Sequence, residues 1–163
     1  MTGRSPRRKL AVNRLREQPN LDHAAVDRFL EDNDVPIIEG DRATFVYRGE
    51  AEDVCLAHRV LGVHPDLPLR RLENTDLWYV VLELPTGSRV EYQYRVTYHG
   101  GDTEQVNDWR NPRVAHSPVG SSSVCHAYGY EVPDWTQPQK ETRPGSIVHI
   151  DVPSRALRRT SSA

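Results

Sequence analysis

The nine residues from Val90 to Tyr98 place an apolar or aromatic side chain at every even position and a polar side chain at every odd position. No other feature of the sequence constrains the fold as strongly. Successive side chains of a β-strand point to opposite faces of the sheet, so this alternation predicts an antiparallel strand with one buried face and one wet face. We therefore expect Tyr92, Tyr94 and Tyr98 in a core.

Further strands follow the same reasoning. They are expected at Thr44–Arg48, Asp53–Arg59, Asp76–Leu84, Ser122–Tyr128 and Ile147–Val152, separated by glycine and proline turns. The segment Asp76–Leu84 is apolar on both faces and should be a central strand, with Trp78 in the core and its indole N–H paired. Several short strands without intervening helices predict a mainly β fold, a β-sandwich.

The first 40 residues differ from this pattern and predict two short helices. One begins at Ser5-Pro6 and ends by Pro19; the other is capped by Asn20 and ends at Asn33-Asp34. Residues 1–17 are basic, whereas the stretch from Asp22 to Asp41 is acidic. Such a basic arm suits either an acidic surface or nucleic acid, or it forms a solvated helix that faces its acidic neighbour, and we favour the last.

The composition excludes several classes of protein. A chain of 163 residues with a formal net charge of -2 has the size of one domain, and it lacks the charge of a dedicated nucleic-acid binder. No run approaches the ~18–20 apolar residues of a membrane span, and no secretory h-region follows the N-terminal arginines. Cys55 and Cys125 fall in expected strands, where a free thiol acts as a small hydrophobe. We expect a cytoplasmic protein without nucleic-acid or membrane partners.

Catalytic motifs are missing. A serine hydrolase needs a nucleophile elbow of the form Gly-x-Ser-x-Gly, and the one serine cluster after a glycine, Gly120 to Ser123, is followed by Val124. The seven histidines show no metal-ligand spacing, with one another or with a cysteine. We expect no catalytic residue, no metal and no cofactor in this chain.

One loop stands out as a candidate binding site. Trp109 lies among polar residues in the segment Asn107–Pro112, next to Arg110. A loop tryptophan beside arginine and asparagine suits stacking on a sugar ring or an aromatic ligand. In the alternative interpretation, Asn111-Pro112 makes a turn and Trp109 closes the end of the sandwich. Both remain open from the sequence.

The order of the motifs resembles the N-terminal domain of the enterochelin (ferric enterobactin) esterase family. The matching stretches are Val35–Glu39, Thr44–Gly49, Pro68–Leu72 with Thr75–Trp78, Tyr92–Tyr94, Asp108–Pro112, Ser122–Val124 and Pro133–Trp135. Trp109 and Arg110 stand where the family usually has proline and leucine. An arginine there favours an anionic ligand such as a catecholate or a carboxylate.

The resemblance implies an immunoglobulin-like early-set sandwich that packs over an α/β-hydrolase domain. We divide the chain accordingly into a helical extension (1–40), the sandwich (41–132), a proline-rich linker (133–145) and the start of an esterase domain (146–163). The family's catalytic residues would lie beyond Ala163.

Three functions follow as hypotheses. The chain is a non-catalytic domain that positions the substrate of an esterase, a carbohydrate-binding module, or a structural domain that pairs through the strand at residues 146–152, for instance as a homodimer. The candidate ligand-binding residues are Asp108, Trp109, Arg110, Asn111 and Trp78. The expected partners are an esterase catalytic domain, in cis or in trans, and a siderophore-like or carbohydrate ligand.

Overall fold

The structure, a computed structural model, describes residues 9–58, 66–118, 120–136, 145–146, 148, 151–154 and 159–162. The chain forms two compact units, Met1–Glu131 and Val132–Ala163, which are described separately. The first holds the helices α1 (Ala11–Arg16) and α2 (His23–Glu31) and the strands β1 (Ile37–Glu39), β2 (Arg42–Arg48), β3 (Asp53–His58), β4 (Asp66–Pro68), β5 (Arg70–Arg71), β6 (Leu77–Glu83), β7 (Arg89–Thr97), β8 (Thr103–Val106), β9 (Val114–Ser117) and β10 (Gly120–His126).

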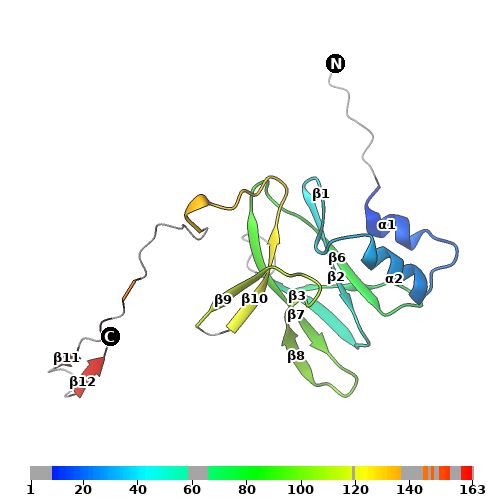
Figure 1. Ribbon diagram of the computed structural model, residues 1–163. Helices are drawn as coiled ribbons and strands as arrows, with labels where there is room; N and C mark the ends of the chain where they lie inside the picture. Colours follow the sequence, from blue (N-terminus) through cyan, green and yellow to red (C-terminus); the bar gives the residue numbers. More distant parts are fainter. Residues whose placement is uncertain are drawn as a thin grey trace. The chain divides into compact units, whose positions relative to one another are not determined.

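Two antiparallel sheets build the first unit (Figure 1). One sheet has the order β1-β2-β6-β5, and the other has the order β4-β3-β7-β10-β9 with β8 also paired to β7. Between the sheets lies a core that includes Phe45 and Trp78 from one sheet and Tyr92 and Tyr94 from the other. The rings of Phe45 and Tyr92 meet edge to face at 4.8 Å. The expectation of a mainly β sandwich is therefore confirmed.

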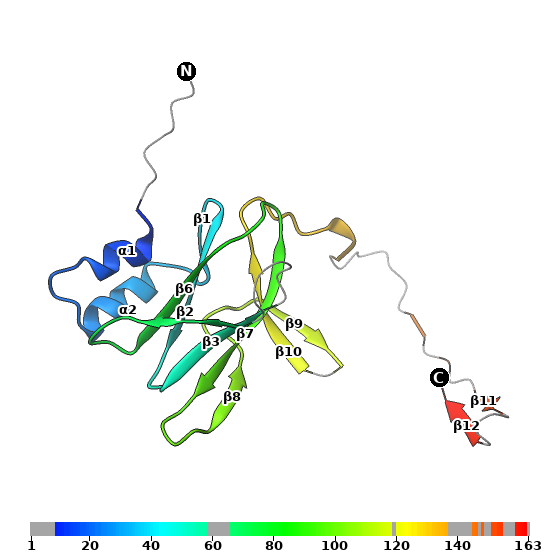
Figure 2. The same ribbon diagram turned by 180° about the vertical axis from the view of Figure 1, so that it is seen from behind.

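The strand β6 has two apolar faces because each face meets a different partner. Trp78 belongs to the core between the sheets, whereas Leu77 and Tyr79 pack with the two helices. Figure 2 shows α1 and α2 beside the β1-β2-β6 sheet from behind. As expected from the sequence, β6 is an interior strand of its sheet. The helical extension thus shares a core with the sandwich.

The helices differ from expectation in two details. Asp22 caps α2 by accepting a hydrogen bond from the backbone N–H of Ala25 at 2.8 Å, so the expected cap at Asn20 is wrong. Within residues 9–41, no ion pair joins α1 to α2; Lys9 pairs with Glu17, and Arg14 lies 3.9 Å from Glu39. The two helices meet through apolar side chains instead. Residues 5–8 of the expected first helix lie outside the described residues.

The long expected strands are present, with ends shifted by one or two residues: β2, β3, β6, β7 and β10. Short strands that the pattern did not reveal complete the sheets: β1, β4, β5, β8 and β9. The chain crosses from one sheet to the other at Leu69, which is buried between β4 and β5 and donates its N–H to the carbonyl of Val54. Cys55 and Cys125 are both free and buried, on strands at opposite sides of β7.

The second unit contains a 3₁₀ helix at Asp134–Thr136 and an antiparallel pair, β11 (Asp151–Ser154) with β12 (Arg159–Ser162). A strand was expected at Ile147–Val152; positions 147, 149 and 150 lie outside the described residues, and the strand begins at Asp151. Because β11 pairs within the chain, one of its edges is already occupied. Most of the expected linker, residues 137–144, is likewise outside the described part.

Candidate functional site

The candidate loop lies where the larger sheet forks. The strand β7 pairs along one edge with β3; along its other edge Val90 and Tyr92 pair with β10, whereas Tyr94 and Val96 pair with β8. Residues 107–113 connect β8 to β9, so they leave the sheet at this fork. The sequence places polar residues there because backbone groups in a fork lack a strand partner and need side chains to satisfy them.

Asp108 anchors the loop inside the sandwich. Its side chain is buried, with 4% of the residue exposed, and its carboxylate accepts hydrogen bonds from the hydroxyls of Tyr92 at 2.8 Å and Tyr94 at 3.3 Å. It also accepts the backbone N–H of Arg110 at 3.1 Å. Burial raises the pKa of Asp108, although these hydrogen bonds act in the opposite direction. Burial and the nearby carboxylate raise the pKa of both tyrosines, so the two hydroxyls stay protonated donors.

Asn111 and Ser123 complete the anchor. The Asn111 amide donates to the Tyr92 hydroxyl at 3.1 Å and to the carbonyl of Val124 at 2.8 Å, while its oxygen accepts the N–H of Arg113 at 3.0 Å. The hydroxyl of Ser123 accepts the backbone N–H of Asp108 at 2.8 Å. Asp108 and Asn111 are thus fully engaged within the protein. They fix the loop rather than offer free polar groups to a ligand.

Trp109 and Arg110, between these two anchors, face outward. Trp109 is 71% exposed, so it does not close the end of the sandwich, and the guanidinium carbon of Arg110 lies 4.9 Å from the centre of its ring. Arg110 also donates a hydrogen bond to the carbonyl of Leu30 at 3.2 Å, near the end of α2. This contact joins the loop to the helical extension, 80 residues earlier in the chain.

A hollow of about 250 Å³ lies beside this pair. Its walls are the exposed Trp109, the half-buried Arg110, the last residues of α2 and the residues that follow that helix: Leu30, Glu31, Asn33, Asp34 and Val35. The carboxamide of Asn33 is fixed by donating to the carbonyl of Phe29 at 2.8 Å. The site therefore presents an aromatic face and a guanidinium on a rigid base. The sequence did not indicate the participation of α2.

Trp78, the fifth candidate, lies elsewhere. It is 6% exposed in the core between the sheets, and its indole N–H donates to the carbonyl of Gly49 at 3.2 Å. Arg71 lies 5.7 Å from the centre of its ring. None of these neighbours belongs to the candidate loop. The structure thus brings four of the five candidates together and leaves Trp78 as the core residue that the strand pattern indicated.

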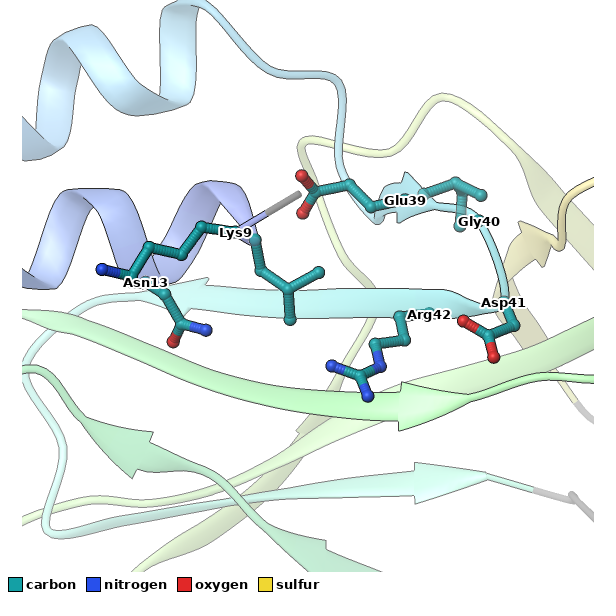
Figure 3. Close-up of a pocket in the computed structure, with 8 residues that line it drawn as sticks. Lys9, Asn13, Glu39, Gly40, Asp41 and Arg42 are labelled. Carbon is teal, nitrogen blue, oxygen red and sulfur yellow. The ribbon is translucent and has the colours of Figure 1, made fainter. Parts of the chain in front are cut away.

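A second hollow of about 580 Å³ lies between the start of α1 and the β1–β2 hairpin (Figure 3). The Glu39 carboxylate points toward α1 and accepts the N–H of Ala11 through both oxygens, at 3.1 and 3.0 Å. Lys9 is engaged by Glu17, and Arg42 by Glu83 at 3.4 Å. These contacts attach the helix to the hairpin. Because these charged side chains are already bonded within the protein, we assign the hollow a structural role, the attachment of α1 to the hairpin.

Among the residues that the structure describes, two serines of β10 are engaged in hydrogen bonds within the protein. The hydroxyls of Ser121 and Ser123 are held by Asn107 and by the N–H of Asp108. Within those residues there is no cluster of three or more histidine, cysteine or acidic side chains that would hold a metal ion. None of the helices described here is long and apolar enough to cross a bilayer.

Solved structures with the same fold include esterases of enterobactin. The ferric enterobactin esterase from Salmonella typhimurium superposes with a TM-score of 0.55 at 17% identity, over 74% of this chain and 40% of that chain. The enterobactin esterase from Shigella flexneri in the presence of enterobactin gives 0.51 at 16% identity, over 74% and 38%. The fold is that of part of an enterobactin esterase.

These comparisons confirm the fold that the resemblance to enterochelin esterases implies. The enterochelin esterase from Shigella flexneri matches 77% of this chain and 40% of its own, with 17% identity and a TM-score of 0.50. The chain spans about two fifths of the length of these esterases. No protein-family model matches the sequence, and no curated protein matches it either.

Proposed function

We propose that the chain is a non-catalytic domain that binds and orients the substrate of an enterobactin-esterase-like enzyme. The observation that carries the proposal is the exposed Trp109 with the half-buried Arg110 beside its ring, on a loop whose base is buried in a hydrogen-bond network. The shared fold with part of the esterases supports it. The catalytic groups would belong to an esterase domain, in cis or in trans.

The loop suits an aromatic ligand whose anionic group reaches Arg110 and points away from Glu31 and Asp34, which also line the hollow. The exposed face of Trp109 offers a stacking surface, and aromatic stacking contributes about 0.5–1.5 kcal/mol beyond the area buried. The Arg110 guanidinium has five N–H donors and spends one nitrogen on the Leu30 carbonyl, so the remaining donors are available to a catecholate or carboxylate. One of the similar esterases was solved in the presence of enterobactin.

The contribution to catalysis would be positional. Holding an ester in a fixed orientation converts an encounter between two bodies into a step within one complex, which reduces the entropic cost of the reaction. The anchors at Asp108 and Asn111 serve this purpose because they keep the loop from rearranging when the ligand binds. The proposed role requires no nucleophile in this chain.

Calorimetric titration with ferric enterobactin tests the proposal. We expect saturable binding that weakens about tenfold or more in Trp109→Ala and in Arg110→Ala. Trp135 is 81% exposed and lies outside the loop, so Trp135→Ala is the matched control and should leave the affinity unchanged. Equal affinity in all four proteins, or no binding, would refute the role of the loop.

Two further measurements separate the alternatives. The purified chain should not hydrolyse p-nitrophenyl esters; turnover that depends on Ser122 would make the chain an enzyme. Retention on glycogen that is lost in Trp109→Ala would identify the loop as the site of a carbohydrate-binding module instead, since the same exposed tryptophan suits a sugar ring.

A further inference from the structure

The outer face of the larger sheet carries a hollow of about 740 Å³ that the proposed function does not use. We name it the outer groove, after its lining residues Ala57, Glu91, Gln93, Gln105, Ser121 and Ser122. Gln93 and Glu91 occupy odd positions of β7, opposite in direction to Tyr92 and Tyr94 in the core. The hollow exists because Ala57 pairs with Gln93 across β3 and β7, and short serines follow on β10.

The amide of Gln93 is held in one orientation. Its nitrogen donates to the side-chain oxygen of Asn107 at 3.1 Å and to the carbonyl of Ser121 at 3.0 Å. Both amide protons are thereby used, so the Gln93 side-chain oxygen remains as an acceptor of fixed position. The groove thus presents a preorganised acceptor without any rearrangement on binding.

Ser121 supplies the complementary donor. Its hydroxyl oxygen accepts the Asn107 amide at 2.7 Å, which leaves the hydroxyl proton to be donated to another acceptor. The half-buried Ser122 and the exposed Gln105 add groups that both donate and accept. The groove therefore offers both donors and acceptors to a ligand.

Both carboxylates that line the groove are paired. Glu91 pairs with Arg89 at 2.7 Å, and Asp66, which also lines the groove, pairs with Arg95 at 2.8 Å. A net charge would favour an ion of opposite sign, but compensated carboxylates favour a neutral ligand.

We propose that the outer groove binds a sugar, a neutral ligand rich in hydroxyl groups. A sugar hydroxyl donates and accepts at once, so one hydroxyl donates to the Gln93 oxygen while it accepts the Ser121 proton. The volume falls in the range of ligand clefts, roughly 300–1,000 Å³. This site is independent of Trp109 and of the esterase-related role, because no residue is common to the two.

An NMR titration of the full chain tests the proposal. The probes are maltohexaose, cellohexaose, xylohexaose and chitohexaose, each up to about 10 mM, where even a millimolar site is largely filled. With at least one probe, the backbone amides of Gln93 and Ser121 and the side-chain amide of Gln93 should shift and saturate. Ala57→Leu, which fills the groove without removing a polar group, should abolish the shifts. Ser121→Ala should weaken binding about 3–10-fold, since it removes one donor.

Two controls keep the result specific. Thr97 has its hydroxyl on the same face of β7 but outside the groove, so Thr97→Ala should bind as the unchanged chain does. Trp109→Ala should bind equally well, which separates this site from the loop. Thermal unfolding of each variant checks that it folds. If no probe gives saturable shifts, or if folded Ala57→Leu and folded Ser121→Ala both bind with unchanged affinity, the proposal is overturned.

Discussion

Asp108 shows how one buried carboxylate determines the shape of a surface loop. It accepts two tyrosine hydroxyls and one backbone N–H, and its own N–H is bonded to Ser123. Its neighbour Trp109 is exposed, and the half-buried Arg110 donates to the carbonyl of the core residue Leu30. The orientation of this pair therefore depends in part on Asp108, a residue that a ligand would not touch.

Replacing Asp108 with alanine should be strongly destabilising. It leaves the hydroxyl of Tyr92 without its carboxylate acceptor in the core, whereas the hydroxyl of Tyr94 keeps the carbonyl of Val46 at 2.8 Å. We expect a loss of about 2–3 kcal/mol in the free energy of unfolding. Asp108→Asn keeps an acceptor oxygen and should cost about 1 kcal/mol. Urea unfolding measures both, with the exposed Asp102→Ala as control. A loss below 1 kcal/mol for Asp108→Ala would contradict the anchoring role.

The roles of the loop residues were only partly predictable. The local composition was enough to indicate Trp109 and Arg110 as candidate ligand contacts. An aromatic residue beside an arginine among polar residues is unusual in a simple turn. Asp108 and Asn111 were grouped with them as ligand contacts, yet their partners Tyr92 and Tyr94 lie 14 to 19 residues away. Spacing within the loop carries no information on such contacts. The clue in the sequence was that buried tyrosines need partners for their hydroxyls.

At the scale of elements, the strand pattern was informative only for long strands. The strands β2, β3, β6, β7 and β10 have six or more residues, which is enough to show an alternation. The strands β1, β4, β5, β8 and β9 have at most four residues, too few for any period to be visible. The fork that holds the loop also depends on the pairing of β10 with β7, two strands distant in sequence, so it could not be inferred.

The cap of α2 gives a direct test at this scale. Asp22 accepts the N–H of Ala25, whereas Asn20 makes no contact of this kind. Asp22→Ala should lower the free energy of unfolding by about 1 kcal/mol, and Asn20→Ala should change it by less than about 0.3 kcal/mol. Chemical denaturation measures both losses. A larger loss in Asn20→Ala than in Asp22→Ala would support Asn20 as the cap, as the sequence suggested.

Ion pairs attach α2 to the sandwich, and they make stability depend on pH. Arg48 bonds to Asp27 of α2 and to Asp76, and His23 of α2 lies 3.2 Å from Asp76. Burial by itself would raise the pKa of Asp76, but hydrogen bonds from Arg48 and the backbone and the charges of Arg48 and His23 lower it below 3.8. The stabilisation is therefore complete above the unfolded pKa and is lost as the pH falls through the folded pKa.

Asp76→Asn should thus be less stable than the unchanged chain by about 1–2 kcal/mol near neutral pH. The difference should shrink as the pH falls through the pKa of Asp76 in the folded protein, because protonation removes the charge that the variant also lacks. Glu83→Gln removes an exposed partner of Arg42 and should have little effect across this pH range. A difference between the Asp76 variant and the unchanged chain that stays constant with pH would show that charge is not the cause.

For the whole molecule, stability should reside in the first unit. Every buried residue of the two cores lies between Leu10 and Ala127. A chain ending at Glu131 should therefore keep its cooperative thermal unfolding, with a midpoint within about 3 °C of the full chain. Circular dichroism measures this. A decrease of more than about 10 °C would mean that residues 132–163 contribute to the fold.

The proposed role of the whole molecule depends on one surface. Of its three tryptophans, Trp78 is in the core, and Trp109 and Trp135 are exposed. The indole N–H signals of all three can be followed while gallium enterobactin, a diamagnetic analogue of the ferric complex, is added. The account requires the Trp109 signal to shift and saturate while the signals of Trp78 and Trp135 stay in place. A Trp109 signal that does not move, or equal shifts at Trp135, would contradict it.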